Sequence, residues 1–171
     1  SFPLDIFQTG SGTSTNMNAN EVIANVASKQ SKLKINANDD VNMSQSSNDV
    51  IPTAICVSAL IDMHKLLLPN LDLLIDTIGK KMLSTKGNVK TGRTHLMDAM
   101  PIDFSQELSG WKAQLESVKK SLTLATTRMS DLPQGGTAIG TGINSHKDFS
   151  KNFCLEVNKL TKFKTKPAKN F

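Results

Sequence analysis

Apolar residues recur with helical spacing along most of the chain, and the most regular run lies in its second half. Seven apolar positions there follow one another at alternating intervals of three and four residues: Leu108, Trp111, Leu115, Val118, Leu122, Ala125 and Met129. This spacing predicts one long helix with an unbroken apolar seam about 30 Å long. Such a seam needs to be covered by other helices, from the same chain or from neighbouring chains.

Three further helices and the links between them follow from the same pattern. We expect a first helix over residues 18–32, a long helical region over 51–84 and a last helix over 147–160. Pro69 falls inside the long region and is expected to break or kink it, because proline lacks a backbone donor and clashes with the preceding turn. Residues 38–40 predict a turn, and residues 87–99 an extended link with a short strand. The fold class is therefore mainly α.

The composition of the 171 residues agrees with a helical bundle and limits the partners. Aromatic residues make up 5% and tyrosine is absent, so the core has to consist of aliphatic side chains. The net charge of +5 indicates an anionic partner. Nucleic acid is disfavoured, because the basic residues do not alternate with aromatic ones as a stacking surface requires. The lysine-rich stretch over 159–169 is more typical of a solvated face.

Cysteine and histidine usage indicates a reducing compartment and no metal motif. Cys56 and Cys154 lie in apolar runs, so we expect two buried thiols without a disulfide framework, and a cytoplasmic location, or the mitochondrial matrix in a eukaryote. The histidines, at positions 64, 95 and 146, do not have metal-ligand spacing. The sequence has no signal peptide and no apolar run of about 18 residues that would span a bilayer.

A cluster of small polar side chains stands directly before the long helical region. Ser46, Ser47 and Asn48 precede an apolar run in which Pro52 occupies a position that the first turn of a helix tolerates. The first backbone N–H groups of a helix have no partner within it, and its N-terminus carries partial positive charge. The cluster therefore predicts an anion site. A plain helix cap, which needs only one such residue, is the alternative.

Two Gly-Thr pairs are further candidates for ligand contacts. Residues 12–13 and 136–137 let the backbone approach a ligand closely while a hydroxyl supplies a directed hydrogen bond. Ordinary turns use the same residues, and this alternative stays open. The glycines that follow, Gly140 and Gly142, lack the preceding strand and the tight turn into a helix that a dinucleotide fingerprint requires.

His95 differs from the other histidines in its surroundings. It follows Thr94 in an extended stretch, whereas His64 lies in the long helical region and His146 near the start of the last helix. An imidazole in such a stretch can carry a proton or donate a hydrogen bond to a carboxylate. We therefore take His95 as a candidate site residue and the other two as structural.

Four segments, taken in order and with the gaps between them, resemble the class II fumarases of the fumarase/aspartase superfamily. They are residues 11–21, SGTSTNMNANE; 41–49, VNMSQSSND; 92–99, GRTHLMDA; and 135–144, GGTAIGTGIN. The resemblance extends from Phe2 to Phe171. It implies an L-aspartase/fumarase-like fold, in which residues 1–45 end an N-terminal domain and residues 46–171 begin a central bundle of long helices.

The resemblance implies an enzyme, a fumarate hydratase of the tricarboxylic acid cycle. Such an enzyme adds water to fumarate reversibly, in anti fashion, and gives L-malate through an aci-carboxylate intermediate. It implies no metal or organic cofactor, a small dicarboxylate as ligand, and a homotetramer with shared active sites that binds neither nucleic acid nor membrane. The alternatives are an aspartase-like ammonia lyase and a non-catalytic helical-bundle interaction module.

The resemblance also assigns roles to single residues. Thr94 and His95 match the family's catalytic Thr-His pair at the substrate carboxylates. His95 favours a fumarase, because aspartases usually carry glutamine there. The positions that match substrate-binding residues are Thr13, Ser46, Ser47, Asn48 and Thr137.

Some positions depart from the family's pattern. Fumarases usually carry His-Pro-Asn-Asp at a second, peripheral anion site, and here that site is left with Asn36, Asn38 and Asp39, without the histidine. Ser105 stands where glycine is usual. The loop with the family's catalytic serine and its Met-Pro-Lys-Asn signature does not occur in these residues, so they do not identify the general base or its acidic partner.

Overall fold

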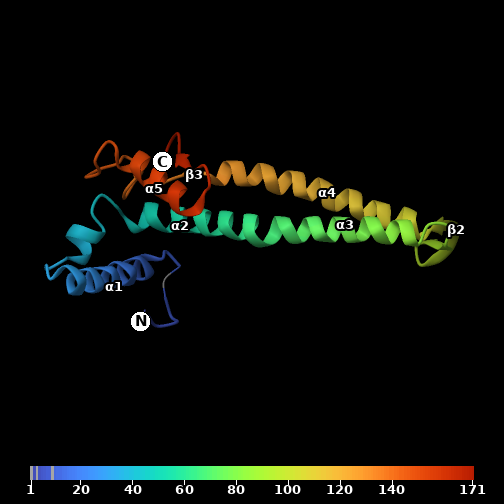
Figure 1. Cartoon of the computed structure of the whole chain (residues 1–171), viewed down its shortest axis with the longest axis horizontal. Coiled ribbons are helices and arrows are strands. Elements are labelled where there is room, and N and C mark those ends of the chain that lie inside the picture. The colour runs from blue at the N-terminus through green and yellow to red at the C-terminus, as the bar shows by residue number, and fades with distance from the viewer. Residues whose placement is uncertain (1, 3, 9) are drawn as a thin grey trace. The chain divides into compact units, whose positions relative to one another are not determined.

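The computed structural model describes residues 2, 4–8 and 10–171 (Figure 1). It divides the chain into two compact units, Ser1–Ala59 together with Met129–Phe171, and Leu60–Arg128. Most of the described chain is helical, which confirms the mainly α fold class. The family-based division at residue 46 is a different kind of boundary and stays a prediction.

The first unit depends on hydrogen bonds as much as on apolar packing. It contains helices α1 (Thr13–Ser31) and α5 (Phe149–Thr161), the π-helical turn η1 (Ala37–Val41), most of helix α2 (Ser47–Asp62), and the paired short strands β3 (Asp131–Leu132) and β4 (Lys166–Pro167). Its buried apolar residues are Ala24, Ala37, Leu132 and Cys154. Its buried polar residues include Asn16, Asn20, Asp49, Gln134 and Thr137. So many buried polar groups require partners, because each one left unpaired costs stability.

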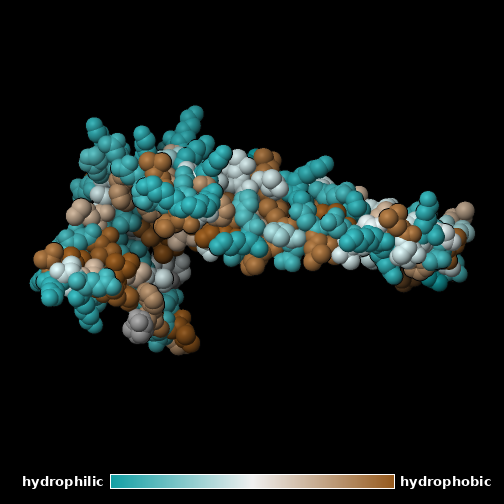
Figure 2. Space-filling model, in the orientation of Figure 1, coloured by the Kyte–Doolittle hydropathy of each residue, from teal (hydrophilic) through white to brown (hydrophobic). Residues whose placement is uncertain are grey.

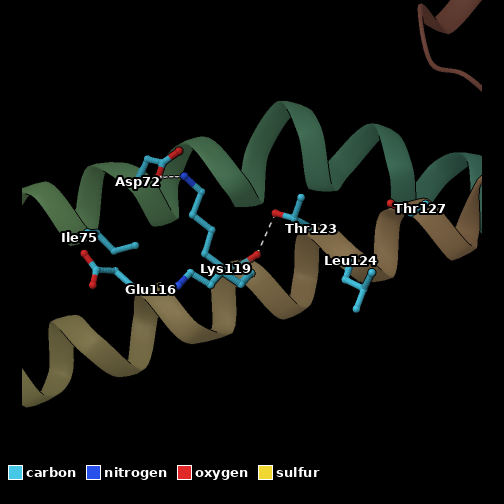
Figure 3. A pocket seen from close by; sticks show the side chains of 8 residues that line it. Asp72, Ile75, Glu116, Lys119, Thr123, Leu124 and Thr127 are labelled. Carbon is cyan, nitrogen blue, oxygen red and sulfur yellow. Dashed lines mark hydrogen bonds and ion pairs between the residues drawn. The ribbon is translucent and has the colours of Figure 1, made fainter.

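The second unit is a pair of helices joined by a β-hairpin. Helix α3 (Leu68–Ser84) leads into strands β1 (Val89–Thr94) and β2 (Met97–Asp103), which are antiparallel, and then into helix α4 (Phe104–Met129). Leu71 and Ile75 of α3 are buried. Lys119 of α4 forms an ion pair with Asp72 of α3 across a groove of about 800 Å³ that both helices line (Figure 3).

Two polar contacts fix the hairpin to the start of α4. The Asp103 carboxylate accepts from the backbone N–H groups of Ser105 and Gly87, each at 2.6 Å. Hydrogen bonds from the side chain and backbone of Ser105 hold the pKa of Asp103 below its ordinary value. Lys90 forms an ion pair with Glu107 at 2.9 Å. The serine that replaces the family's usual glycine at position 105 therefore takes part in this connection.

The sequence predicts a break or a kink at Pro69, and the break is wrong. The chain is helical without interruption from Ser47 to Ser84, and a π-helical turn, η2 (Met63–Leu67), lies directly before α3. Pro69 therefore falls in the first turn of α3, where a missing N–H is tolerated. The wider π-helical turn before it relieves the crowding that a proline ring causes with the preceding carbonyl groups. A change of helix type thus accommodates the proline.

Several predicted boundaries also shift. Helix α1 begins at Thr13, ahead of the predicted residue 18, after Gly12 in a left-handed conformation with φ of 75°. The turn expected at residues 38–40 lies inside η1, and the link expected over 87–99 is a hairpin whose second strand continues to Asp103. Cys154 is buried as expected, whereas Cys56 is only half-buried.

The long helix contradicts one expectation about membranes. By length and composition alone, Ser47–Ser84 is apolar enough to cross a bilayer, and 11% of its most apolar window is buried within this chain. Figure 2 shows hydrophobic side chains at many points on the surface of the long helices. A helix at the centre of a bundle formed by several chains would meet the same criterion of length and composition.

The apolar seam of α4 is only partly covered within the chain. Trp111 and Val118 are exposed, whereas Leu108, Leu115 and Leu122 are half-buried. On α3, Leu73 and Leu83 are exposed by 65% and 78%. Exposed apolar groups that lie together on one helical pair mark a surface that associates with other helices.

We expect a polypeptide of residues 1–171 to self-associate, because water contacts these apolar side chains. Light scattering coupled to gel filtration measures this. The double variant Leu73→Gln, Leu83→Gln should lower the apparent mass, whereas Leu33→Gln, which changes an exposed leucine of the first unit, should not. A soluble monomer of the unchanged sequence would contradict the expectation.

Candidate functional site

The start of α2 is closed by a reciprocal pair of hydrogen bonds. Ser46 precedes the helix, and its Oγ accepts from the backbone N–H of Asn48 at 3.2 Å. In return, Asp49 Oδ1 accepts from the backbone N–H of Ser46 at 2.9 Å. This arrangement is a capping box, and it fixes the direction in which the chain enters the helix.

Asp49 also holds a second segment against this helix end. Its other carboxylate oxygen, Oδ2, accepts from the backbone N–H groups of Gly135 and Thr137 at 3.0 and 2.9 Å. The Asn48 side chain adds a bond to the carbonyl of Ala138 at 2.7 Å. Asp49 is 2% exposed, so these bonds lie in a water-poor environment where each one matters more. The loop over residues 135–138 is thereby fixed beside the N-terminus of α2.

The conformation of that loop requires a glycine and strains a threonine. Gly135 has φ of 108°, and a Cβ atom at this position would come within 2.7 Å of Ser150 Cβ. Thr137 adopts φ of 56°, which is uncommon for a β-branched residue. Strained residues of this kind persist only where their surroundings hold them, and they concentrate at functional sites. Here the Asp49 carboxylate is the group that holds Thr137.

Asparagine side chains connect α1 to the same place. Asn16 Nδ2 donates to Ser47 Oγ at 3.1 Å and to Asn42 Oδ1 at 3.3 Å. Asn20, one helical turn further along α1, donates to the same Asn42 oxygen at 2.9 Å. Asn42 Nδ2 in turn donates to the carbonyl of Gln45 at 3.3 Å. These bonds fix the segment that precedes α2 against the buried face of α1.

These elements line an open cavity of about 350 Å³. Polar and small side chains from α1, the segment before α2 and the Thr137 loop line it, among them Asn16, Asn42, Ser46, Ser47, Thr137 and Asn144. The hydroxyl oxygen of Thr137 is buried and has no hydrogen-bond partner within residues 2, 4–8 and 10–171. An anion would meet the polar side chains that line the cavity and the positive end of α2 beside them, because the Thr137 oxygen itself is closed off from solvent.

Thr13 is close in the sequence to Asn16, which lines this cavity, but Thr13 itself does not line it. It is the first residue of α1, it is exposed, and its hydroxyl is 3.4 Å from that of Ser11. Gly12 packs so closely on Ile51 of α2 that a Cβ atom would approach it within 2.8 Å. This contact places the start of α1 against the first turns of α2, one helical turn before Asn16.

Thr94 and His95 belong to the second unit and are not among the residues that the first unit brings together. They lie at the tip of the hairpin, where His95 and Leu96 have φ of 49° and 62°. Two successive left-handed residues form such a turn readily when they are asparagine and glycine, and at a cost when they are histidine and leucine. Both Thr94 and His95 are exposed, so the hairpin presents them to whatever contacts its tip.

The residues of the possible second anion site form a cap of their own. Asn36 Oδ1 accepts from the backbone N–H groups of Asn38 and Asp39 at 2.8 and 3.1 Å. Asp40 Oδ2 accepts from the backbone N–H of Asn36 at 2.7 Å. The N–H groups of Asn38 and Asp39 are therefore already bonded to Asn36, the residue at the position of the family's histidine. A second anion site at Asn36, Asn38 and Asp39 stays a prediction.

A protein-family model described as lyase matches residues 1–171. The chain belongs to this lyase family. It is 49% identical to "fumarate hydratase class II 2" of Pseudomonas aeruginosa, 51% to the class II fumarate hydratase of Xylella fastidiosa and 48% to that of Bacillus subtilis. These alignments cover 99%, 99% and 94% of this lyase chain. They cover 37%, 36% and 36% of the relatives, so the chain spans little more than a third of their length.

Solved structures of similar proteins have the same fold. The crystal structure of a class II fumarase from Schistosoma mansoni matches with a TM-score of 0.90 and 39% identity, over 98% of this lyase chain and 40% of that one. A fumarate lyase:delta crystallin from Brucella melitensis matches with a TM-score of 0.88 and 38% identity, over 98% of this chain and 37% of that one. The resemblance inferred from four short segments is confirmed.

Sequence reasoning missed the residues that organise this site. In the sequence, Asp49 is simply the end of a polar segment, although its place three residues after Ser46 is the spacing of a capping box. Neither Asn16, which precedes the predicted first helix, nor Asn20, which lies inside it, stands out in the pattern. Their separation of one helical turn, on a face that also carries the buried Ala24, is the signal that both point inward.

Replacing Asp49 should destabilise the lyase more than any exposed carboxylate does. The substitution Asp49→Asn retains the shape of the side chain but removes the charged acceptor of three N–H groups, two of them buried. We expect a loss of about 2–4 kcal/mol in the free energy of unfolding. A lower thermal midpoint in calorimetry checks this. Asp148→Asn, at a side chain that is 54% exposed, is the matched control and should leave the midpoint nearly unchanged. Equal midpoints for the two variants would contradict the role given to Asp49.

Proposed function

We propose that the protein to which this chain belongs is a class II fumarate hydratase, which adds water to fumarate reversibly and gives L-malate. The observation that carries the proposal is the cavity at the N-terminus of α2, which Ser46, Ser47 and Thr137 line. The class II fumarate hydratases that align with 94–99% of the chain support it. Within that protein, this chain supplies the part that binds the substrate carboxylates.

The chemistry of the reaction matches the donors that the chain offers. Removal of a proton next to a carboxylate places a second negative charge on that carboxylate, giving an aci-carboxylate. Catalysis then depends on donors that are already oriented toward the developing charge. Ser46, Ser47, Asn48 and Thr137 gather at a helix end whose partial charge is positive, and Thr13 lies at the start of the neighbouring helix. The general base belongs to a segment of the family outside these residues.

Thr94 and His95 complete a site in another subunit under this proposal. They lie at an exposed hairpin tip in a unit separate from the cavity, and their strained turn needs a surrounding structure to hold it. The exposed apolar faces of α3 and α4 support a homotetramer whose central bundle covers them. The apolar helix Ser47–Ser84 then lies in a protein bundle in the cytoplasm, and neither membrane nor nucleic acid takes part.

A direct assay tests the proposed activity. The complete protein should consume fumarate, followed by the loss of its ultraviolet absorbance, and the activity should persist after exhaustive treatment with a chelator, because hydroxyl and amide donors provide the charge stabilisation. The same preparation is offered L-aspartate. Release of ammonia from aspartate without hydration of fumarate would identify an ammonia lyase, and an activity that only a metal restores would contradict the proposed donor set.

Mixed oligomers test the shared site. His95→Asn and Asn48→Ala should each lower kcat by about 100-fold or more, since His95 would contact the substrate carboxylates and Asn48 holds the loop that carries Thr137. After subunit exchange, a mixture of the two variants should recover part of the activity, because some sites then receive His95 from one chain and Asn48 from another. If mass spectrometry proves exchange and every mixture stays inactive, the sites are not shared between chains.

A further inference from the structure

We propose that Asn16 is a positioning residue that makes the Ser47 hydroxyl a hydrogen-bond donor to the bound carboxylate. The proposal rests on the function proposed above and adds to it the residue that makes the Ser47 hydroxyl donate to the carboxylate. Asn16 is 6% exposed and lines the cavity together with Ser47. Its two amide hydrogens are both used, one toward Ser47 Oγ at 3.1 Å and one toward Asn42 Oδ1 at 3.3 Å.

The orientation of the Asn16 amide follows from a fixed backbone group. The carbonyl of Gln45 can only accept, so the Asn42 NH₂ group that lies 3.3 Å from it must face it. The Asn42 oxygen then faces α1, where Asn16 and Asn20 both donate to it. Asn16 therefore presents NH₂ and not oxygen to this side of the cavity. The Gln45 carbonyl therefore determines the donor direction of the hydrogen bonds that run from Asn42 through Asn16 to Ser47.

This order determines what Ser47 offers to a ligand. A serine hydroxyl has one hydrogen to donate and two lone pairs that accept. Because one lone pair receives the Asn16 N–H, the hydroxyl hydrogen has to point elsewhere, and within residues 2, 4–8 and 10–171 no other hydrogen-bond partner of Ser47 Oγ is present. The free hydrogen suits a carboxylate, which only accepts. With the opposite orientation, a lone pair would face the anion and repel it.

The substitution Asn16→Asp reverses this order with little change in shape. The introduced carboxylate would accept the Ser47 hydrogen and leave the serine lone pairs toward the ligand. Binding of succinate, a dicarboxylate that cannot react, should weaken by a factor of about 10 to 100 in titration calorimetry, as expected for the loss of one bond to a charged acceptor. Binding should recover in part as the pH falls, because a protonated carboxyl can donate to Ser47 again.

A double-variant comparison separates this role from a structural one. Ser47→Ala removes the hydroxyl through which Asn16 acts, so adding Asn16→Ala, which introduces no charge, to Ser47→Ala should weaken succinate binding by less than about threefold more. The carboxylate of Asn16→Asp also repels a dianion directly, so part of its effect should remain in the Ser47→Ala background. Asn20→Ala removes an equivalent bond to Asn42 but leaves the Asn16–Ser47 bond in place, so its effect on binding should be the smaller one.

Each possible result leads to a different conclusion. If Asn16→Asp binds succinate as the unchanged protein does, or if the effect of Asn16→Ala is undiminished in the Ser47→Ala background, the positioning role is overturned. If Asn16→Asp does not fold, the Asn16→Ala comparison decides by the same criterion. If the unchanged protein neither binds succinate nor hydrates fumarate, the proposed function fails, and this outcome differs from every result that concerns Asn16 alone.

Discussion

The Asp49 carboxylate is the group on which the arrangement of the first unit depends. It accepts hydrogen bonds from the N–H groups of Ser46, Gly135 and Thr137 at 2.9 to 3.0 Å, in a position that is almost completely buried. One oxygen closes the start of α2 and the other holds the loop that carries Thr137. A charged acceptor with several donors offsets the cost of its own burial, whereas any one of these donors left alone would lose stability. The candidate site thus lies beside a buried carboxylate whose charge the N–H groups of Ser46, Gly135 and Thr137 stabilise.

The sequence predicts the local features of this site and not the contacts between distant segments. The polar cluster at Ser46, Ser47 and Asn48 is recognisable because capping preferences act within one turn of a helix. Asp49 belongs to the same segment, yet its partners Gly135 and Thr137 lie 86 and 88 residues further along the chain. No spacing rule connects such positions. The same limit applies to Asn16, whose inward direction depends on Asn42 and Ser47.

The helices show where pattern reasoning succeeds and where backbone chemistry overrides it. The seam from Leu108 to Met129 predicts α4 and its end at Met129, because seven apolar positions at this spacing fit only the period of a helix. The helix over Ser47–Ser84 contains Pro52 near its start and Pro69 further along, and the sequence rule predicts a break or a kink at Pro69. The structure has a π-helical turn before Pro69, which widens the helix where the proline ring would otherwise crowd the preceding carbonyl groups. The pattern of apolar residues contains no signal for this change of helix type.

Asn36 behaves as a tethered ligand of its own backbone. Its side-chain oxygen occupies the two N–H groups that open the π-helical turn η1, at a local concentration that no dissolved anion reaches. An anion would have to displace the Asn36 amide oxygen, so its affinity for these N–H groups would depend on competition with that oxygen as well as on the shape of the turn. The Asn36 side chain can therefore block anion binding at these two N–H groups without any change in the backbone. Replacing Asn36 by alanine would free these two N–H groups, whereas the backbone hydrogen bonds from Val41 and Asn42 that shape η1 would stay in place.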